Sequence, residues 1–218
     1  MSISIRRTGM ALVLAASTLA TLTACFPLAV GGAVMGSMVA TDRRTTGTVV
    51  EDEGIELRSA SRIREALGER GHVNVTSYNR QALLTGEVAS AQDKQLVEQI
   101  VSGVDNVRHI VNELAVMGNS TLTQRSSDAL VTGRVKASLV DAKELSANAF
   151  KVITERGTTY VMGRVTAREA RIATQVISST SGVQKVVRIL ETISEEELAR
   201  MMAPPPNQGS ASKQDSGQ

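Results

Sequence analysis

Apolar and polar positions follow the same succession of patterns twice between residues 54 and 193, first at helical and then at strand spacing. In the first copy, four apolar residues recur at the spacing of one helix face: Leu57, Ala60, Ile63 and Leu67. Alternation around Val73 and Val75 then predicts a strand, and residues 82–88 predict a second one. Asn79-Arg80, between these two strands, predicts a hairpin turn.

The first copy continues with a second helix and a third strand. Residues 90–93 have the composition of a helix start, and Gly103 has the position of a helix end. The apolar face expected for this helix consists of Val97, Ile100, Val101 and Val104. Alternation over residues 107–116 predicts the third strand.

The second copy predicts the same order of elements. Its first helix is expected to begin at Ser127 or Asp128. The buried face of that helix is expected to hold Val131, Val135 and Leu139. The remaining elements are a strand at Phe150 and Val152, a turn at Arg156-Gly157, a helix over 167–180 and a strand over 183–192. About five extra residues, at 141–146, precede the first strand of this copy.

Three short motifs recur in the same order, which identifies the copies as an internal repeat. The pairs are residues 83–88 with 160–165, 103–107 with 182–186, and 62–67 with 134–139. A unit of this size buries only about 60% of its surface, so the two are expected to pack against each other. The predicted fold class is α+β: two tandem αββαβ domains, over 54–118 and 124–193, each a small three-stranded mixed sheet packed by two helices.

The first 24 residues have the organisation of a secretory signal, with basic Arg6 and Arg7 before an apolar stretch. The sequence Leu-Thr-Ala-Cys at 22–25 resembles a bacterial lipobox, in which the Cys is diacylated, cleaved and acylated on its new amino group. We therefore expect a signal peptide over 1–24, and a diacylglycerol and an N-acyl chain on Cys25. Residue 26 is Phe rather than the Asp that retains such lipoproteins at the inner membrane, which favours the periplasmic face of the outer membrane.

Two alternatives to the lipid anchor remain open. Residues 18–20 could serve an ordinary signal cleavage site. The region could also be one uncleaved membrane helix, because no charged residue occurs between Arg7 and Asp42. Gly32 and Gly36 would then have the spacing of a helix-packing pair.

Composition narrows the function classes. Removal of the two signal arginines takes the formal net charge from +2 to zero, and no basic stripe indicates a nucleic-acid partner. With two Phe, two Tyr and no Trp, the chain offers almost no stacking platforms. Its one Cys leaves no disulfide or thiolate metal site, so no cofactor is expected besides the acyl chains. Residues 25–53 are expected to be a flexible tether and 203–218 a disordered tail.

The recurring Gly-Glu/Arg-Val motif, followed by a helix and Gly-Val-x-x-Val, is similar to the BON domain of bacterial envelope proteins. Two such domains behind a lipobox resemble the dual-BON outer-membrane lipoproteins, as do residues 40–48 and 161–170. The resemblance implies αββαβ modules that bind phospholipid, a role in outer-membrane integrity and a place at the division site. It also implies possible partners among outer-membrane assembly or division proteins.

A comparison of the first helices shows which copy carries apolar residues that could contact lipid. On the repeat alignment, Arg58 faces Leu130, Ser59 faces Val131 and Gly68 faces Val140, so apolar residues appear in the second copy only. Leu130 lies off the predicted buried face, and basic neighbours on the same helix suit an anionic headgroup layer. The resemblance to the dual-BON lipoproteins implies that this helix of the second domain contacts lipid. The predicted phospholipid-binding residues are therefore Leu130, Val131, Arg134, Val135, Lys136 and Val140. The alternative is that these apolar residues pack against the first copy.

Catalysis is not expected. His72 and His109 are the only side chains with a near-neutral ordinary pKa, and neither has a nucleophile or an orienting partner in the sequence. Acidic residues at 195–197 suit a helix N-terminus after Ser194. The leading hypothesis is a non-enzymatic lipoprotein that binds anionic phospholipid. The alternative hypothesis is a periplasmic protein–protein adaptor for envelope assembly or cell-wall remodelling machinery.

Overall fold

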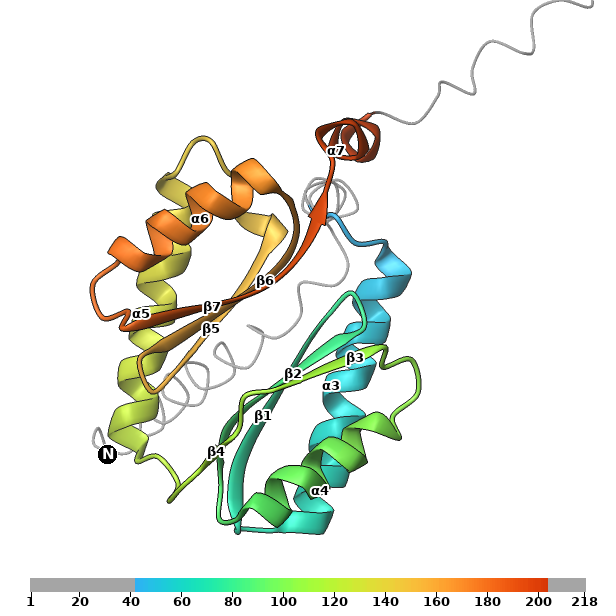
Figure 1. The fold of residues 1–218 in the computed structure, drawn as a ribbon, viewed down its shortest axis with the longest axis vertical. Coiled ribbons are helices and arrows are strands. Elements are labelled where there is room, and N and C mark those ends of the chain that lie inside the picture. Colours follow the sequence, from blue (N-terminus) through green and yellow to red (C-terminus); the bar gives the residue numbers. More distant parts are fainter. Residues whose placement is uncertain (1–41, 204–218) are drawn as a thin grey trace, which may run out of the picture. The chain divides into compact units, whose positions relative to one another are not determined.

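The computed structural model describes residues 42–203 (Figure 1). The expected signal peptide, Cys25, the tether up to residue 41 and the tail from residue 204 lie outside the described residues. The first domain contains α3 (Thr46–Leu67), β1 (Gly71–Tyr78), β2 (Gln81–Val88), α4 (Ala91–Ser102), β3 (His109–Asn112) and β4 (Ala115–Val116). The second contains α5 (Leu122–Asp141), the short 3-10 helix η2 (Ala147–Ala149), β5 (Phe150–Glu155), β6 (Thr158–Thr166), α6 (Ala167–Ser179) and β7 (Lys185–Ile193). A further helix, α7 (Glu195–Met202), follows.

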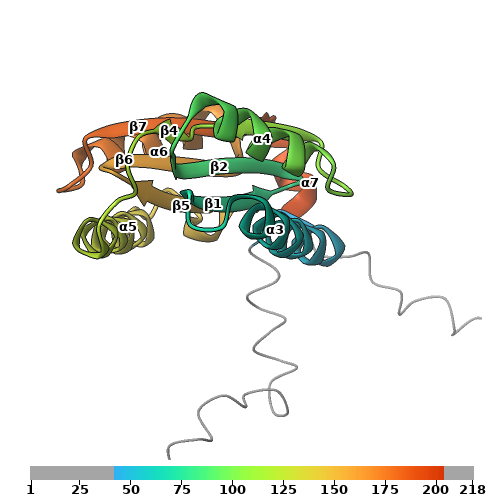
Figure 2. The ribbon, with the colours of Figure 1, turned by 90° about the horizontal axis from the view of Figure 1, so that it is seen from below.

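Both sheets are mixed, which confirms the predicted fold class. In the first domain, β1 and β2 are antiparallel, and β2 runs parallel to β3 and β4. In the second domain, β5 and β6 are antiparallel, and β6 runs parallel to β7. Each sheet is packed by two helices of its own domain, with α3 beside β1 and α5 beside β5 in Figure 2.

Alternation along the central strands divides the core into three parts. Ala82 and Leu84 of β2 face the helices of the first domain, whereas Leu83 faces the other way, because successive strand residues point to opposite faces. Leu83 joins a cluster that contains residues of both domains: Tyr78, Leu83, Tyr160, Met162 and Ile189. The two domains therefore pack together through the sheet faces that their helices leave uncovered, as the small size of each unit predicts.

Both hairpin turns and the N-terminal cap of α4 follow the sequence expectations. Asn79 and Arg80 have φ of 51° and 66°, and Arg156 and Gly157 have φ of 51° and 74°. Two consecutive positive φ angles are the geometry of the tight turn that matches strand twist. The Ser90 side chain accepts a hydrogen bond from the Asp93 backbone N–H at the start of α4. The helix start and both turns are therefore as expected.

The prediction of a flexible tether is wrong for residues 42–53. Helix α3 begins at Thr46, well before the expected boundary at 54. Its buried stripe consists of Asp52, Ile55, Ser59, Ile63 and Leu67, whereas Leu57, expected on that face, is 73% exposed. Two polar side chains interrupt the buried stripe, so the apolar pattern alone shows neither its true start nor its true face.

The predicted start of the second domain's first helix is also wrong. Helix α5 begins at Leu122, where Thr121 and Gln124 form a reciprocal capping box. Asp128, expected as a cap, is buried inside the helix. A third difference concerns the strand predicted over 107–116, which is divided into β3 and β4 because Leu114 turns into the core between them.

Candidate functional site

Large apolar side chains are exposed on the outer face of α5. Leu122, Leu130 and Val140 are 78%, 64% and 68% exposed. At 3.6 residues per turn these positions fall on one side of the helix, opposite the buried stripe. Gly133 and Ala137 lie between them and are also exposed. The sequence comparison identified Leu130 and Val140, and it missed Leu122 because the helix start was placed too late.

Basic side chains border this apolar face. Arg134 and Lys136 are both exposed, on opposite flanks of the stripe, and Arg125 is half-buried. The acidic residues of α5 are Asp128, which is buried, and Asp141, which is exposed at the last position of the helix. The outer face of α5 therefore combines apolar protrusions with a local excess of positive charge over most of its length.

Two of the predicted phospholipid-binding residues cannot serve that role. Val131 is 5% exposed and Val135 is fully buried, and both belong to the core of the second domain. Contact with lipid would require these side chains to leave the core. The predicted set is therefore corrected to Leu130, Arg134, Lys136 and Val140, with Leu122 added.

Equivalent contacts show how the first helices of the two domains correspond. In the first domain, the Asp52 carboxylate accepts hydrogen bonds from the backbone N–H groups of both turn residues, at 2.8 and 2.7 Å. In the second domain, Asp128 accepts the same pair of bonds from its own hairpin turn, at 2.8 and 3.0 Å. Asp52 therefore corresponds to Asp128, and the buried residues that follow correspond in order.

The alignment of the first helices expected from the sequence is consequently wrong by four residues. Residues 58–63, not 62–67, correspond to 134–139. A slip of about one helical turn leaves the same face buried, so the apolar pattern does not reveal it. The first turn residue, Asn79, lies 27 residues after Asp52, and its counterpart Arg156 lies 28 residues after Asp128. Between the first helix and the hairpin turn, the second copy therefore has one extra residue rather than the expected five.

The corrected correspondence changes the residue pairs, but it still places apolar residues of the second domain opposite residues of the first domain that are not apolar. Gly54 corresponds to Leu130 and Arg64 corresponds to Val140. Arg58 corresponds to Arg134, so this position is basic in both domains. The second domain therefore carries apolar side chains where the first has a glycine and an arginine. The expected alternative, that Leu130 packs against the first domain, does not hold, because this side chain is 64% exposed.

The segment before α3 is attached to the second domain by a buried ion pair that sequence reasoning missed. The Arg43 guanidinium donates to both carboxylate oxygens of Glu169, at 2.6 and 2.8 Å, and to the Arg164 carbonyl at 2.9 Å. Both side chains of the pair are nearly inaccessible. Burial raises the pKa of Glu169, but hydrogen bonds from Arg43 and Thr166 outweigh it, and the net pKa lies below its ordinary value.

A second arginine continues this attachment within the first domain. Arg44 pairs with Asp42 and Asp52, each at 2.8 Å, and its guanidinium lies 4.4 Å from the centre of the Tyr78 ring. Cations favour such positions over aromatic faces. Residues 42–44 are therefore fixed to both domains, so the chain leading from Cys25 reaches the fold at a defined point.

His72 lies beside Arg125 and Glu87 at the edge of the first sheet. Burial, together with the charge of Arg125, lowers the pKa of His72 despite its proximity to Glu87. This lowered pKa favours the neutral form of the His72 imidazole. Within residues 42–203, no three His, Cys, Asp or Glu side chains lie close enough to hold a metal ion. Over the same residues, none of the helices combines the length and the hydropathy that a membrane span requires.

Comparison with known proteins identifies both repeats. The family model described as "BON domain" matches residues 55–118 and 127–192. The outer membrane lipoprotein DolP of Haemophilus influenzae is 33% identical over 172 residues, which cover 78% of this chain and 89% of that protein. A 21 kDa hemolysin of Actinobacillus pleuropneumoniae is 30% identical over 154 residues, which cover 70% of this chain and 79% of that one.

Among solved structures, CdsD, a structural protein of the type III secretion system of Chlamydia trachomatis, matches with 14% identity and a TM-score of 0.29. The match covers 67% of this chain and 98% of that one.

Proposed function

The chain belongs to the BON-domain family and is a dual-BON relative of the DolP outer-membrane lipoproteins, and from this membership we propose that it is a non-enzymatic lipoprotein that binds anionic phospholipid through α5. Its acylated Cys25 holds it on the periplasmic face of the outer membrane, where it supports membrane integrity. A place at the division site, implied by the resemblance, belongs to the same proposal.

The observation that carries the proposal is the outer face of α5, with Leu122, Leu130 and Val140 each more than 60% exposed. Full burial of one Leu or Val side chain stabilises by about 1.5–3 kcal/mol. A cation near an anionic membrane surface adds about 1 kcal/mol, which applies to Arg134 and Lys136. Three apolar side chains and two cations together support reversible binding to an anionic bilayer.

The anchor and α5 have different tasks in this proposal. Acyl chains contribute about 0.8 kcal/mol per buried methylene, so three chains would hold the protein on a membrane without help from α5. Seventeen positions separate Cys25 from Asp42, which limits their separation to about 60 Å of extended chain. The anchor therefore keeps α5 at high effective concentration near lipid, and α5 selects the lipid.

Vesicle co-sedimentation tests the proposal with a chain that starts at residue 42 and therefore lacks the anchor. We expect binding to vesicles with anionic lipid, weaker binding at high salt because the charges are screened, and little binding to phosphatidylcholine vesicles. Leu130→Glu places a charge on the face and should abolish binding. Leu57→Glu is the matched control, because Leu57 is comparably exposed on α3 and should not affect binding.

The same experiment separates the adaptor hypothesis. Lipid binding would be refuted if the anchorless chain bound vesicles of no lipid composition. The adaptor would be favoured if, in addition, Leu130→Glu abolished the crosslinking of a protein partner in intact cells. An apolar face with basic flanks can contact either a membrane or a protein. Vesicle binding and protein crosslinking are therefore measured on the same variants.

A further inference from the structure

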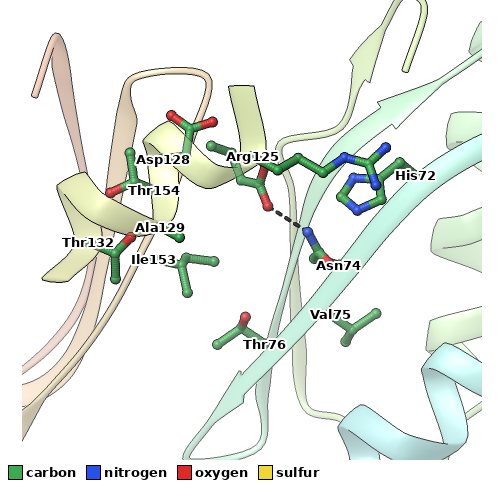
Figure 3. A pocket seen from close by; sticks show the side chains of 11 residues that line it. His72, Asn74, Val75, Thr76, Arg125, Asp128, Ala129, Thr132, Ile153 and Thr154 are labelled. Carbon is green, nitrogen blue, oxygen red and sulfur yellow. Dashed lines mark hydrogen bonds between the residues drawn. The ribbon is translucent and has the colours of Figure 1, made fainter. Parts of the chain in front are cut away.

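A cleft lies between the two domains, beside the inner flank of α5. Its volume is about 500 Å³, within the range of small-ligand sites. It is bordered by β1, α5 and β5. In Figure 3, Thr132 and Ile153 lie on one side of the cleft and Asn74 and Thr76 on the other, with Arg125 and His72 above them. Neither domain alone would form it.

Polar groups around the cleft have unused hydrogen-bonding capacity. Glu155 accepts one hydrogen bond, from Asn74 at 2.6 Å, which is the dashed line in Figure 3. Its other carboxylate oxygen has no hydrogen-bond partner among the described residues, and the same is true of the hydroxyls of Thr76 and Thr132. These three oxygen atoms line a partly open cleft, so they are available to a ligand that supplies hydrogen-bond donors.

The sheet beneath the cleft contains a buried group without a partner. Thr85 is fully buried, and its hydroxyl makes no hydrogen bond within residues 42–203. It pairs directly with Asn74 across β1 and β2, so both side chains lie on the face of the sheet that forms the cleft floor. This unsatisfied hydroxyl lies in the sheet beneath the cleft and does not itself line it.

The charge around the cleft favours a cation. Three carboxylates, from Asp128, Glu155 and the underlying Glu87, face two guanidinium groups. Both guanidinium groups have partners: Arg125 donates to Ser120, and Arg156 pairs with Glu87 at 3.4 Å. Both Asp128 oxygens are also used, by the β5–β6 turn. Among these three carboxylates, Glu155 is therefore the one with an oxygen that has no hydrogen-bond partner within residues 42–203.

The electrostatics of Glu155 agree with this arrangement. Burial raises the pKa of Glu155, and the charges of Glu87 and Asp128 raise it further. The Asn74 hydrogen bond and the charge of Arg125 lower it, and the net pKa lies above its ordinary value. A positively charged ligand would reverse this effect. A primary ammonium group suits the site because its three N–H donors match the free oxygens of one carboxylate and two hydroxyls.

We propose that the interdomain cleft binds a primary ammonium group, which pairs with Glu155 and donates hydrogen bonds to Thr76 and Thr132. The ammonium group could belong to an ethanolamine-type lipid headgroup or to a soluble amine of similar size, since both present the same chemistry. The site is distinct from the exposed face of α5, and the proposal does not depend on anionic lipid binding.

Equilibrium dialysis of labelled ethanolamine against the full acylated protein in nonionic detergent tests this site. We expect saturable binding at one site per chain at pH 7. Glu155→Gln should weaken the binding at least tenfold, and Thr76→Val, which keeps the charge, should weaken it by a smaller factor. Glu144→Gln, an exposed carboxylate outside the cleft, and Leu130→Glu, which tests the α5 proposal separately, should leave it unchanged.

A second arm identifies the source of the amine. Displacement of labelled ethanolamine by vesicles that contain phosphatidylethanolamine, but not by phosphatidylcholine vesicles, assigns the site to a lipid headgroup. Saturable binding without such displacement assigns it to a soluble amine. The proposal would be overturned if the wild-type protein showed no saturable binding. It would also be overturned if the wild type, Glu155→Gln and Thr76→Val bound ethanolamine with equal affinity.

Discussion

Replacement of Ser59 by alanine should stabilise the protein. Ser59 is fully buried in α3, and its hydroxyl has no hydrogen-bond partner among the described residues. It corresponds to Val135 in the second domain, where an apolar side chain occupies the equivalent core position. The polar group is therefore not required by the fold, and its removal relieves an unfavourable burial.

The size of this effect follows from two contributions. A buried polar group without a partner costs about 1–3 kcal/mol, part of which is offset by the contacts of the oxygen that Ser59→Ala removes. Alanine also favours the helix over serine by about 0.5 kcal/mol. We expect a net gain of about 1–1.5 kcal/mol, which raises the melting temperature by roughly 2–5 °C for a chain of this length.

Thermal and urea unfolding of the two serine variants provide the assay. Ser61→Ala is the matched control, because Ser61 lies exposed on the same helix and reports helix propensity alone. Ser59→Ala should exceed Ser61→Ala by about 0.5–1 kcal/mol. A Ser59→Ala variant no more stable than Ser61→Ala would refute the reasoning, since the buried hydroxyl would then carry no penalty.

Three further changes test the contacts that position the site. Gly86→Ala should prevent stable folding, because Gly86 has φ of 106° and a Cβ there would lie 2.0 Å from the His72 carbonyl oxygen; circular dichroism would show it. Asp128→Ala should destabilise by about 2 kcal/mol in urea unfolding, by leaving the turn N–H groups unpaired. Arg43→Met should cost about 3 kcal/mol at pH 7 by leaving Glu169 unpaired. Since the folded pKa of Glu169 lies below its ordinary 4.5, the stability from the pair is complete above pH 4.5 and is lost as pH falls through the folded pKa, so wild type and variant should converge in acid.

The sequence predicted those elements whose local chemistry decides their geometry. The Asn79-Arg80 and Arg156-Gly157 turns, the Ser90 cap and the strand alternation depend on neighbours in the chain, and the repeat made each of them visible twice. The start of α3 could not be predicted in this way. Its first turns are fixed by Asp52, whose partners lie 27 residues away in a turn, and a buried aspartate does not belong to an apolar pattern.

The candidate site shows the same division. Exposure of Leu130 follows from its position off the buried stripe of α5, and the sequence indicated it. The burial of Val131 and Val135 was also visible in the pattern, and their inclusion among lipid contacts was a mistake of assignment. The Arg43–Glu169 pair joins residues 126 positions apart, and the interdomain cleft requires both sheets, so neither leaves a periodic signal in the chain.

Lipid selection by α5 is the central claim, and binding of the anchorless chain to anionic vesicles tests it most directly. The account predicts that this chain co-sediments with anionic but not with phosphatidylcholine vesicles, that Leu130→Glu abolishes the binding and that Leu57→Glu retains it. Equal binding by the wild type and Leu130→Glu, or equal loss in both variants, would contradict it.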